Sequence, residues 1–319
     1  MRRVRPDGAL AASAARAEWL TRRERGSLLL LRAMSVVSRV FGRTPTRAIL
    51  YLIAAYFVFF APTAKRHARN YLRRALAREP RFADLFRQVL YFATSIHDRI
   101  FLLSDRFDEF DFTIEGDAEM RSVAARGQGA FLLGAHMGSF EVSRAIGINE
   151  PGLKVVMAMY ADNTSKVNAM LASLRPTVKP DIIFLGQIQA MLEVQRRLDE
   201  GAFVGILADR TLGDEPVREL DFLGSPANFP VGPMRAAALL RRPTILMLGL
   251  YRGANRYHLV FERLVDFSSV SREQRSRAVD EAIERYAVLL EKYCRSDPYN
   301  WSNWFDFWGD EPAHRPRPR

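Results

Sequence analysis

Short apolar runs alternate with amphipathic stretches through the last two thirds of the chain. Each run holds few polar residues, whereas most of the intervening stretches repeat apolar side chains at helical spacing. Near-continuous apolar strands joined by helices indicate a mostly parallel sheet covered on both faces. We therefore expect an α/β fold, a mostly parallel sheet flanked by helices. The predicted strands cover 112–115, 130–135, 155–159, 182–185, 203–208, 245–251 and 257–261.

Helices are expected between most of these strands. Pro233 lies at the start of one of them, a position at which its fixed φ favours a helix. The last two strands are separated by residues 252–255 alone, which predicts an antiparallel hairpin. The predicted helices cover 82–103, 140–146, 164–174, 187–199, 232–240 and 271–295.

A different pattern covers the N-terminal third. Residues 19–41 repeat apolar side chains at spacings of three and four, with arginines on another stripe, as in a basic amphipathic helix. Gly42 and Pro45 interrupt it, and residues 48–61 then form a run of 14 uncharged, mostly large apolar residues. Because spanning a bilayer takes about 20 residues, this run is expected to lie in the membrane interface or to be buried in the fold. Another basic helix follows and ends near Pro80.

Charge separates the same two parts of the chain. The formal net charge is +11, from 47 Lys+Arg and 36 Asp+Glu. Residues 1–100 hold 20 of these cations and 6 of these anions, a net charge of +14, whereas the remainder carries −3. Arginines that flank apolar helices favour an anionic membrane surface as partner, and a solvated face beside a core helix is the alternative. Nucleic-acid binding is disfavoured, because its arginines would be interleaved with exposed aromatic and polar residues.

Composition narrows the class of protein. With 48% hydrophobic and 26% charged residues, the chain is neither disordered nor collagenous. A single cysteine, Cys294, excludes an internal disulfide and a multi-thiolate zinc site. The five histidines show no paired ligand spacing, so no metal is expected. No signal peptide is readable, which predicts the cytoplasmic side. We expect membrane-associated helices over 1–80, the α/β domain over 81–308 and a disordered tail over 309–319.

Candidate chemistry follows the predicted strand 130–135. It leads directly into His136, and Glu141 comes five residues later. With Ser139 as a helix N-cap, Glu141 would lie in the first helical turn and could fold back to orient the imidazole. A base oriented by a carboxylate is suited to general base catalysis. The alternative is a structural histidine at a strand end and an acid favoured by the helix dipole.

A second strand brings further polar groups. Asp209 and Arg210 come directly after the predicted strand 203–208. Reactive groups in such sheets gather at the carboxyl ends of the strands. We therefore expect this carboxylate and guanidinium at the same edge as His136.

The segment Gly134-Ala135-His136-Met137-Gly138-Ser139-Phe140-Glu141 resembles the H-x4-D/E signature of the glycerolipid acyltransferase superfamily. The wider context is similar to the bacterial branch that contains the late lauroyl and myristoyl transferases of lipid A assembly. Residues 221–233 resemble its F-G-x-P-A…G-P/T block, and the basic, apolar N-terminal helices agree as well. The aromatic ending over 298–308 is more similar to a sub-branch associated with aryl polyene lipids.

The resemblance implies transfer of an acyl chain from an acyl carrier protein or coenzyme A thioester to a hydroxyl of a lipid acceptor, at the inner face of the bacterial inner membrane. By position, His136 is the general base, Glu141 orients it, and Asp209 matches a further acidic position of the lipid A branch. That branch also has an arginine where this chain shows Met159-Tyr160-Ala161-Asp162. Arg210 is the candidate for the missing phosphate or oxyanion contact, by its place at a strand end.

A thioester is already activated, so its transfer needs a base and an oxyanion donor but no metal or redox cofactor. Because Cys294 is expected to pack and Ser139 to cap, we expect direct transfer in a ternary complex without an acyl-enzyme. Candidates for the wall of an acyl slot, with plain core positions as the alternative, are Phe222, Leu223, Phe229 and Met234.

Two further interpretations stay open from the sequence. The terminal aromatic residues either form an interfacial belt or cap the open end of the sheet, and Trp304, Phe307 and Trp308 are spaced like one helical face. The alternative to an enzyme is a non-catalytic module that binds membrane or nucleic acid through its basic N-terminal third.

Overall fold

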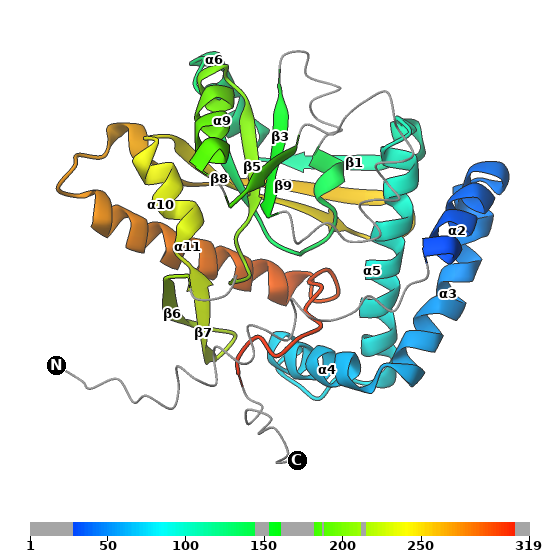
Figure 1. Cartoon of the computed structure of the whole chain (residues 1–319). Helices are drawn as coiled ribbons and strands as arrows, with labels where there is room; N and C mark the ends of the chain where they lie inside the picture. The colour runs from blue at the N-terminus through cyan, green and yellow to red at the C-terminus, as the bar shows by residue number, and fades with distance from the viewer. Residues whose placement is uncertain (1–27, 144–152, 161–181, 187, 212–214, 310–319) are drawn as a thin grey trace, which may run out of the picture.

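A seven-stranded sheet lies at the centre of the molecule (Figure 1). The computed structural model describes residues 28–143, 153–160, 182–186, 188–211 and 215–309. The strand order is β1-β9-β8-β2-β5-β3-β4, and every neighbouring pair is parallel except β8 and β9, which form the predicted antiparallel hairpin. The mostly parallel α/β fold is therefore confirmed. The strands are β1 (Asp111–Glu115), β2 (Ala130–Gly134), β3 (Val155–Tyr160), β4 (Ile182–Leu185), β5 (Phe203–Leu207), β8 (Pro243–Tyr251) and β9 (Arg256–Asp266).

Each face of the sheet has its own hydrophobic core. Phe131 and Leu133 of β2 pack into one cluster with helices α4 (Pro62–Leu76), α9 (Ile188–Asp199), α10 (Gly232–Leu239) and α11 (Arg275–Ser296). Ala130 and Leu132 pack into the other with α5 (Phe82–Leu102) and α6 (Asp117–Ala125). Since successive side chains of a strand point to opposite faces, a strand buried on both faces must be apolar throughout. This is why β2 and β8, buried at every position, are almost entirely apolar, with Thr244 of β8 as the polar exception.

The N-terminal helices lie at the side of the sheet, against α5 (Figure 1). Helix α2 (Leu28–Phe41) turns at Gly42, whose φ of +82° favours glycine, into α3 (Arg43–Phe60). The apolar run predicted from 48 to 61 is thus one helix with two faces, of which Leu50, Ala54 and Val58 form the buried one. No described helix is by itself long and apolar enough to cross a bilayer. Helices α3 and α4 together have the length and composition of a span, but they meet at 96°.

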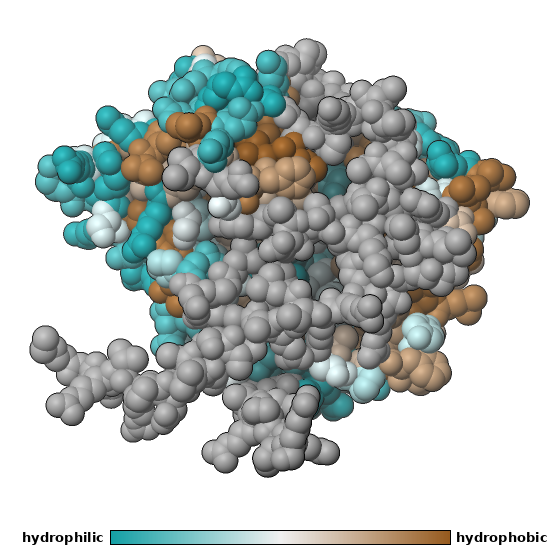
Figure 2. Space-filling view, viewed as in Figure 1, coloured by the Kyte–Doolittle hydropathy of each residue, from teal (hydrophilic) through white to brown (hydrophobic). Residues whose placement is uncertain are grey.

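An apolar surface covers the outer side of these helices. Figure 2 shows apolar side chains along the edge where α2 and α3 lie. Aromatic contacts between Phe59 and Phe82 and between Tyr51 and Phe86 continue this surface from α3 onto α5. Its most exposed residues are Val36, Val40, Phe41, Tyr51, Leu52, Tyr56, Phe59, Phe60 and Phe82.

Two elements differ from the sequence prediction. Strands β6 (Val217–Phe222) and β7 (Ser225–Pro230) form a separate hairpin that the pattern did not predict. Prolines at 226 and 230 argue against a strand, and the turn places Leu223, at φ +53°, before Gly224. The terminal aromatic residues lie in an irregular segment rather than on a helix. Trp301 is buried, and Trp304, Phe307 and Trp308 pack against the main core, which favours a packing role over an interfacial belt.

Parts of several predictions lie outside the described residues. These are the predicted helix 164–174, the start of the helix 19–41 and the tail from 310 onward. Of the predicted helix 140–146, the described part is a 3-10 turn, Phe140–Ser143. The domain boundary near residue 80 stays a prediction, and α4, which precedes it, contributes four buried residues to the main core.

A buried ion pair fixes α3 to the rest of the protein. The Arg43 guanidinium donates two hydrogen bonds, of 2.7 and 2.8 Å, to the Asp98 carboxylate on α5, and Tyr257 donates a third to Asp98 at 2.9 Å. Arg43 and Asp98 are only 5% and 0% exposed. Although burial opposes the charge, His97 and Arg43 hold the pKa of Asp98 below its usual range.

Asp98→Ala would leave the Arg43 guanidinium buried without its counterion. We expect the free energy of unfolding, measured by urea denaturation, to fall by about 3–5 kcal/mol. Glu281→Ala breaks the exposed Arg277–Glu281 pair and is the control, with an expected change below about 1 kcal/mol. Equally small losses in both variants would contradict this account.

Candidate active site

The sheet brings His136 and Asp209 together. Strands β2 and β5 are parallel neighbours in which Gly134 lies opposite Leu207, so the two residues after each strand run on side by side. His136 Nδ1 lies 2.8 Å from Asp209 Oδ1. The Asp209 side chain is fully buried, whereas 31% of the His136 side chain is exposed. The imidazole is therefore anchored through Nδ1 and remains partly exposed.

The second oxygen of Asp209 is also occupied. Oδ2 accepts the backbone N–H of His136 at 3.0 Å and the indole N–H of Trp301 at 2.9 Å. Burial alone would raise the pKa of Asp209, but His136, Arg210 and the Trp301 N–H outweigh it and lower that pKa. Asp209 is therefore a carboxylate at neutral pH.

This contact fixes the tautomer of His136. Because a carboxylate only accepts hydrogen bonds, the proton of neutral His136 lies on Nδ1 and the lone pair on Nε2. Burial lowers the pKa of His136, the Arg210 and Arg99 charges lower it further, and Asp209 opposes them. The imidazole is thus neutral at pH 7 and can take a proton at Nε2.

Glu141 does not fold back onto His136, contrary to the sequence prediction. Its Oε2 lies 2.8 Å from Arg99 Nε of α5 and accepts the Ser139 hydroxyl at 3.1 Å. The prediction was wrong because it considered only local sequence: Arg99 draws Glu141 toward α5, and Asp209 already occupies His136 Nδ1. The Ser139 hydroxyl donates to the Glu141 carboxylate, and the element that follows it is a 3-10 turn. The role of Ser139 as an N-cap stays a prediction.

The turn after His136 depends on two glycines. Gly138 has a φ of +71°, and a Cβ there would collide with the carbonyl oxygen of Gly249 on β8. A Cβ on Gly249 would in turn collide with the carbonyl oxygen of Ser139. Gly138 thus permits a tight turn that lies closely packed against the backbone of β8.

Arg210 lies beside the histidine and reaches the C-terminal segment. Its guanidinium donates to the Ser302 carbonyl at 2.7 Å and lies over the ring of Phe305, 5.0 Å from its centroid. Burial lowers the pKa of Arg210. The predicted strand-end position is confirmed, and its role as an oxyanion or phosphate contact stays a prediction.

The acyl-slot candidates are all in the packed core. Phe222 contacts Phe229 and Trp301, and exposure does not exceed 4% at any of the four predicted positions. The structure thus places Phe222, Leu223, Phe229 and Met234 in the main cluster, the alternative that the sequence left open.

Two contacts of the candidate site, Asp209–Trp301 and Glu141–Arg99, could not be found from sequence. Trp301 lies 92 residues from Asp209 in the chain, and Arg99 lies 42 residues before Glu141, so no local spacing connects either pair. The only sequence signals were an aromatic-rich ending and the run His97-Asp98-Arg99.

Metal-dependent and thiol-based chemistry have less support from the described residues. Among the described residues, no group of His, Cys, Asp and Glu side chains could hold a metal ion. Cys294 is buried as predicted, and burial raises the pKa of its thiol, so it is a poor nucleophile.

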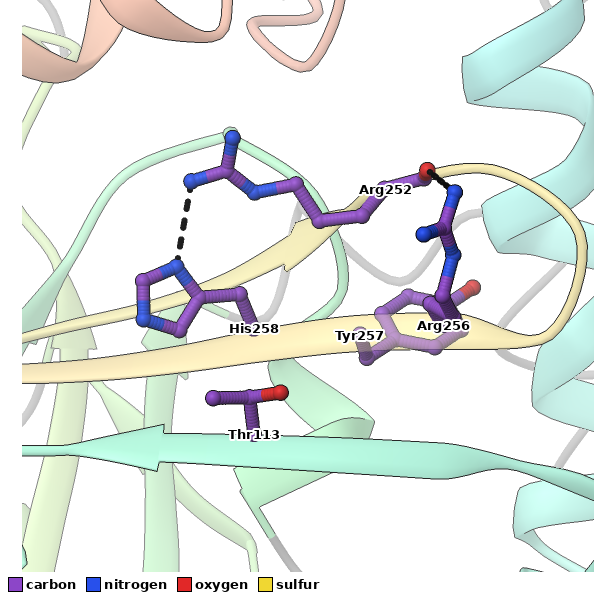
Figure 3. Close-up of a pocket in the computed structure, with 5 residues that line it drawn as sticks. All are labelled: Thr113, Arg252, Arg256, Tyr257 and His258. Atoms are coloured by element: carbon purple, nitrogen blue, oxygen red, sulfur yellow. Dashed lines mark hydrogen bonds between the residues drawn. The ribbon is translucent and has the colours of Figure 1, made fainter.

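A basic pocket lies at the β8–β9 turn (Figure 3). Its volume is about 320 Å³, and none of the predicted site residues lines it. Its cations are already engaged. Arg252 contacts Asp297 and His258, and Arg256 donates to the Arg252 carbonyl. The residues that line it are Thr113, Arg252, Arg256, Tyr257 and His258.

Comparison with known families identifies the family of the chain. The model of the bacterial lipid A biosynthesis acyltransferases matches residues 33–306, which include both His136 and Trp301. The chain belongs to this family. It is therefore an acyltransferase that acts on lipid, and the non-catalytic alternative is not supported. No curated protein matches the chain.

The Arg210 charge should control the basicity of His136. Removing it in Arg210→Gln takes away a cation that disfavours imidazolium, so we expect the pKa of His136 to rise. The imidazole resonance of this acyltransferase, assigned with His136→Ala and titrated by NMR, measures the change. Arg277→Gln, at an exposed position on α11, should leave the titration unchanged. An unchanged or lower pKa in Arg210→Gln would contradict the geometry.

Proposed function

We propose that this acyltransferase moves a fatty acyl chain from an acyl carrier protein or coenzyme A thioester to a hydroxyl of a membrane lipid or glycolipid. The observation that carries the proposal is the His136–Asp209 contact, with Nδ1 held at 2.8 Å and Nε2 left as a base. The His136 side chain is partly exposed, and the acceptor hydroxyl is proposed to reach Nε2 from this exposed part.

His136 acts as general base in a direct transfer. Nε2 takes the proton of the acceptor hydroxyl while its oxygen attacks the thioester carbonyl carbon, and the carbonyl π electrons move to oxygen. Collapse of the tetrahedral intermediate breaks the C–S bond, and the leaving thiolate takes the proton from His136. Asp209 stabilises the imidazolium between these steps. A thioester needs no metal or redox cofactor for this reaction.

An acyl-enzyme is not part of the proposal. Cys294 is buried and holds its proton, and the Ser139 hydroxyl, fully buried, donates to Glu141 rather than to a base. Arg210 is proposed as the cationic contact for a substrate phosphate, since its guanidinium lies at the same strand end as His136. Glu141 fixes the signature motif to α5 through Arg99.

The exposed apolar face of α2 and α3 is proposed to dock on the cytoplasmic face of the bacterial inner membrane. Exposed Leu52, Phe59 and Phe60 would enter the interface, and cations at its border, such as Arg39 and Arg87, would contact anionic head groups. The 14-residue apolar run suits a helix lying in the surface. The aromatic ending favours an acceptor of the aryl polyene lipid class, as the resembling sub-branch suggests.

Transfer can be measured on anionic vesicles made from bacterial inner-membrane lipid extract. Lauroyl–acyl carrier protein and lauroyl–coenzyme A serve as donors in separate reactions, and mass spectrometry detects a lipid that gains one acyl group. We expect His136→Ala to reduce transfer about 10²–10⁴-fold, because the general base is lost, while binding to vesicles is unchanged.

A docking variant separates chemistry from localisation. Replacing Leu52, Phe59 and Phe60 by serine should weaken vesicle co-sedimentation and transfer together, without changing the titration of His136. If no lipid gains an acyl group with either donor, or if His136→Ala transfers as fast as the wild type, the proposed function is wrong.

A further inference from the structure

The four backbone N–H groups from His136 to Ser139 are all in use. The N–H of His136 donates to Asp209, and that of Met137 donates to the Ala135 carbonyl at 2.6 Å. The N–H groups of Gly138 and Ser139 donate to the carbonyls of Asn300 and Gly249, at 3.0 and 2.8 Å. Acyl transfer requires a donor for the oxyanion that forms on the carbonyl oxygen. In this turn, that donor cannot be one of these four backbone groups.

Asn303 carries a side-chain donor and follows a residue whose backbone contacts this turn. Both its Nδ2 and its Oδ1 are buried without a hydrogen-bond partner, and no other amide side chain among the described residues leaves both of these atoms unpaired. It directly follows Ser302, whose N–H donates to the His136 carbonyl at 2.8 Å and whose carbonyl accepts Arg210. The backbone that carries Asn303 is therefore fixed between the base and the cation of the site.

Asn300, in the same segment, shows what a structural asparagine does here. Its Oδ1 accepts the Tyr251 N–H at 2.8 Å, and its Nδ2 donates to the Tyr251 carbonyl at 3.1 Å. Asn300 is 4% exposed and Asn303 is 1% exposed, so both amides are shielded from water. A buried amide without partners lowers stability, and native proteins keep few of them. Asn303 thus retains hydrogen-bonding capacity that the fold itself does not use.

We propose that Asn303 is a catalytic residue that forms the oxyanion hole. This inference rests on the proposed function. Nδ2–H donates to the carbonyl oxygen of the acyl thioester and keeps that bond while the C–O bond forms and the oxygen becomes an oxyanion. When the C–S bond breaks, the electrons return to the carbonyl and the thiolate takes its proton from His136. Oδ1 accepts the amide N–H that lies beside the thioester in the pantetheine arm, which both donor types carry.

Burial strengthens this interaction. A donor that is already oriented and shielded from water stabilises a developing charge more than a solvated donor does. Because only 1% of Asn303 is exposed, the acyl donor must displace the groups that cover the amide before transfer occurs.

The test compares Asn303→Ala with Asn303→Asp and with Asn300→Ala as the matched control. Each full-length variant is measured for kcat and KM toward lauroyl–acyl carrier protein on the lipid-extract vesicles, and for its thermal unfolding midpoint. We expect Asn303→Ala to lose about 10²–10³-fold in kcat with an unchanged or higher midpoint, because an unpaired buried amide is removed. Asn303→Asp keeps the acceptor and should lose kcat with little change in KM. Asn300→Ala should lower the midpoint.

The outcomes distinguish this inference from the function on which it rests. If the wild type transfers acyl groups and Asn303→Ala keeps its kcat within threefold, the inference is wrong and the function stands. If Asn303→Ala loses activity together with its unfolding midpoint, as Asn300→Ala does, the amide is structural and the inference is also wrong. Failure of the wild type to transfer overturns the function, whereas the unfolding midpoints still report whether the fold uses the Asn303 amide.

Discussion

One buried carboxylate holds the candidate active site together. Asp209 accepts hydrogen bonds from the His136 ring, the His136 backbone and the Trp301 indole, on its two oxygens. These donors come from the end of β2 and from the C-terminal segment, whereas Asp209 itself follows β5. A carboxylate removed from water is stable as an anion only when such donors surround it. His136 is therefore oriented as a base only when the ends of β2 and β5 and the C-terminal segment have folded together around Asp209.

Helix α5 connects this site to the N-terminal helices. Asp98 binds Arg43 of α3 in a buried pair, and the next residue, Arg99, pairs with Glu141 of the signature motif. Two successive residues of one helix thus fix the apolar surface of α2 and α3 and the motif that carries the base. In the proposed function, this arrangement gives the active site a fixed position relative to the lipid surface that presents the acceptor.

The fold was largely readable because the sheet is buried on both faces. Strands such as β2 and β8 are then apolar at nearly every position, and a pattern of apolar runs detects them. The sequence pattern did not predict the hairpin of β6 and β7, because this hairpin contains two prolines and turns at a leucine with positive φ. Its conformation is set by packing on the main core and not by the local preference of its residues.

The sequence predicted the position of the site residues but not their contacts. Strand ends placed His136, Asp209 and Arg210 at one edge, which a sequence pattern can indicate. The sequence could not show which acid contacts His136. Glu141 is five residues away in the chain but binds Arg99. Asp209 is 73 residues away and binds the imidazole. Strand register decides this pairing, and register is a property of the whole sheet.

The tautomer of His136 tests most directly whether Asp209 orients the base. In Asp209→Asn, the two N–H donors at Oδ2 require the amide oxygen there, so the amide NH₂ would face His136 Nδ1 and force the ring proton onto Nε2. Nitrogen-15 NMR of the neutral imidazole should then show protonated Nδ1 in the wild type and in Glu141→Gln, and protonated Nε2 in Asp209→Asn. A tautomer that changes in Glu141→Gln and persists in Asp209→Asn would contradict the account.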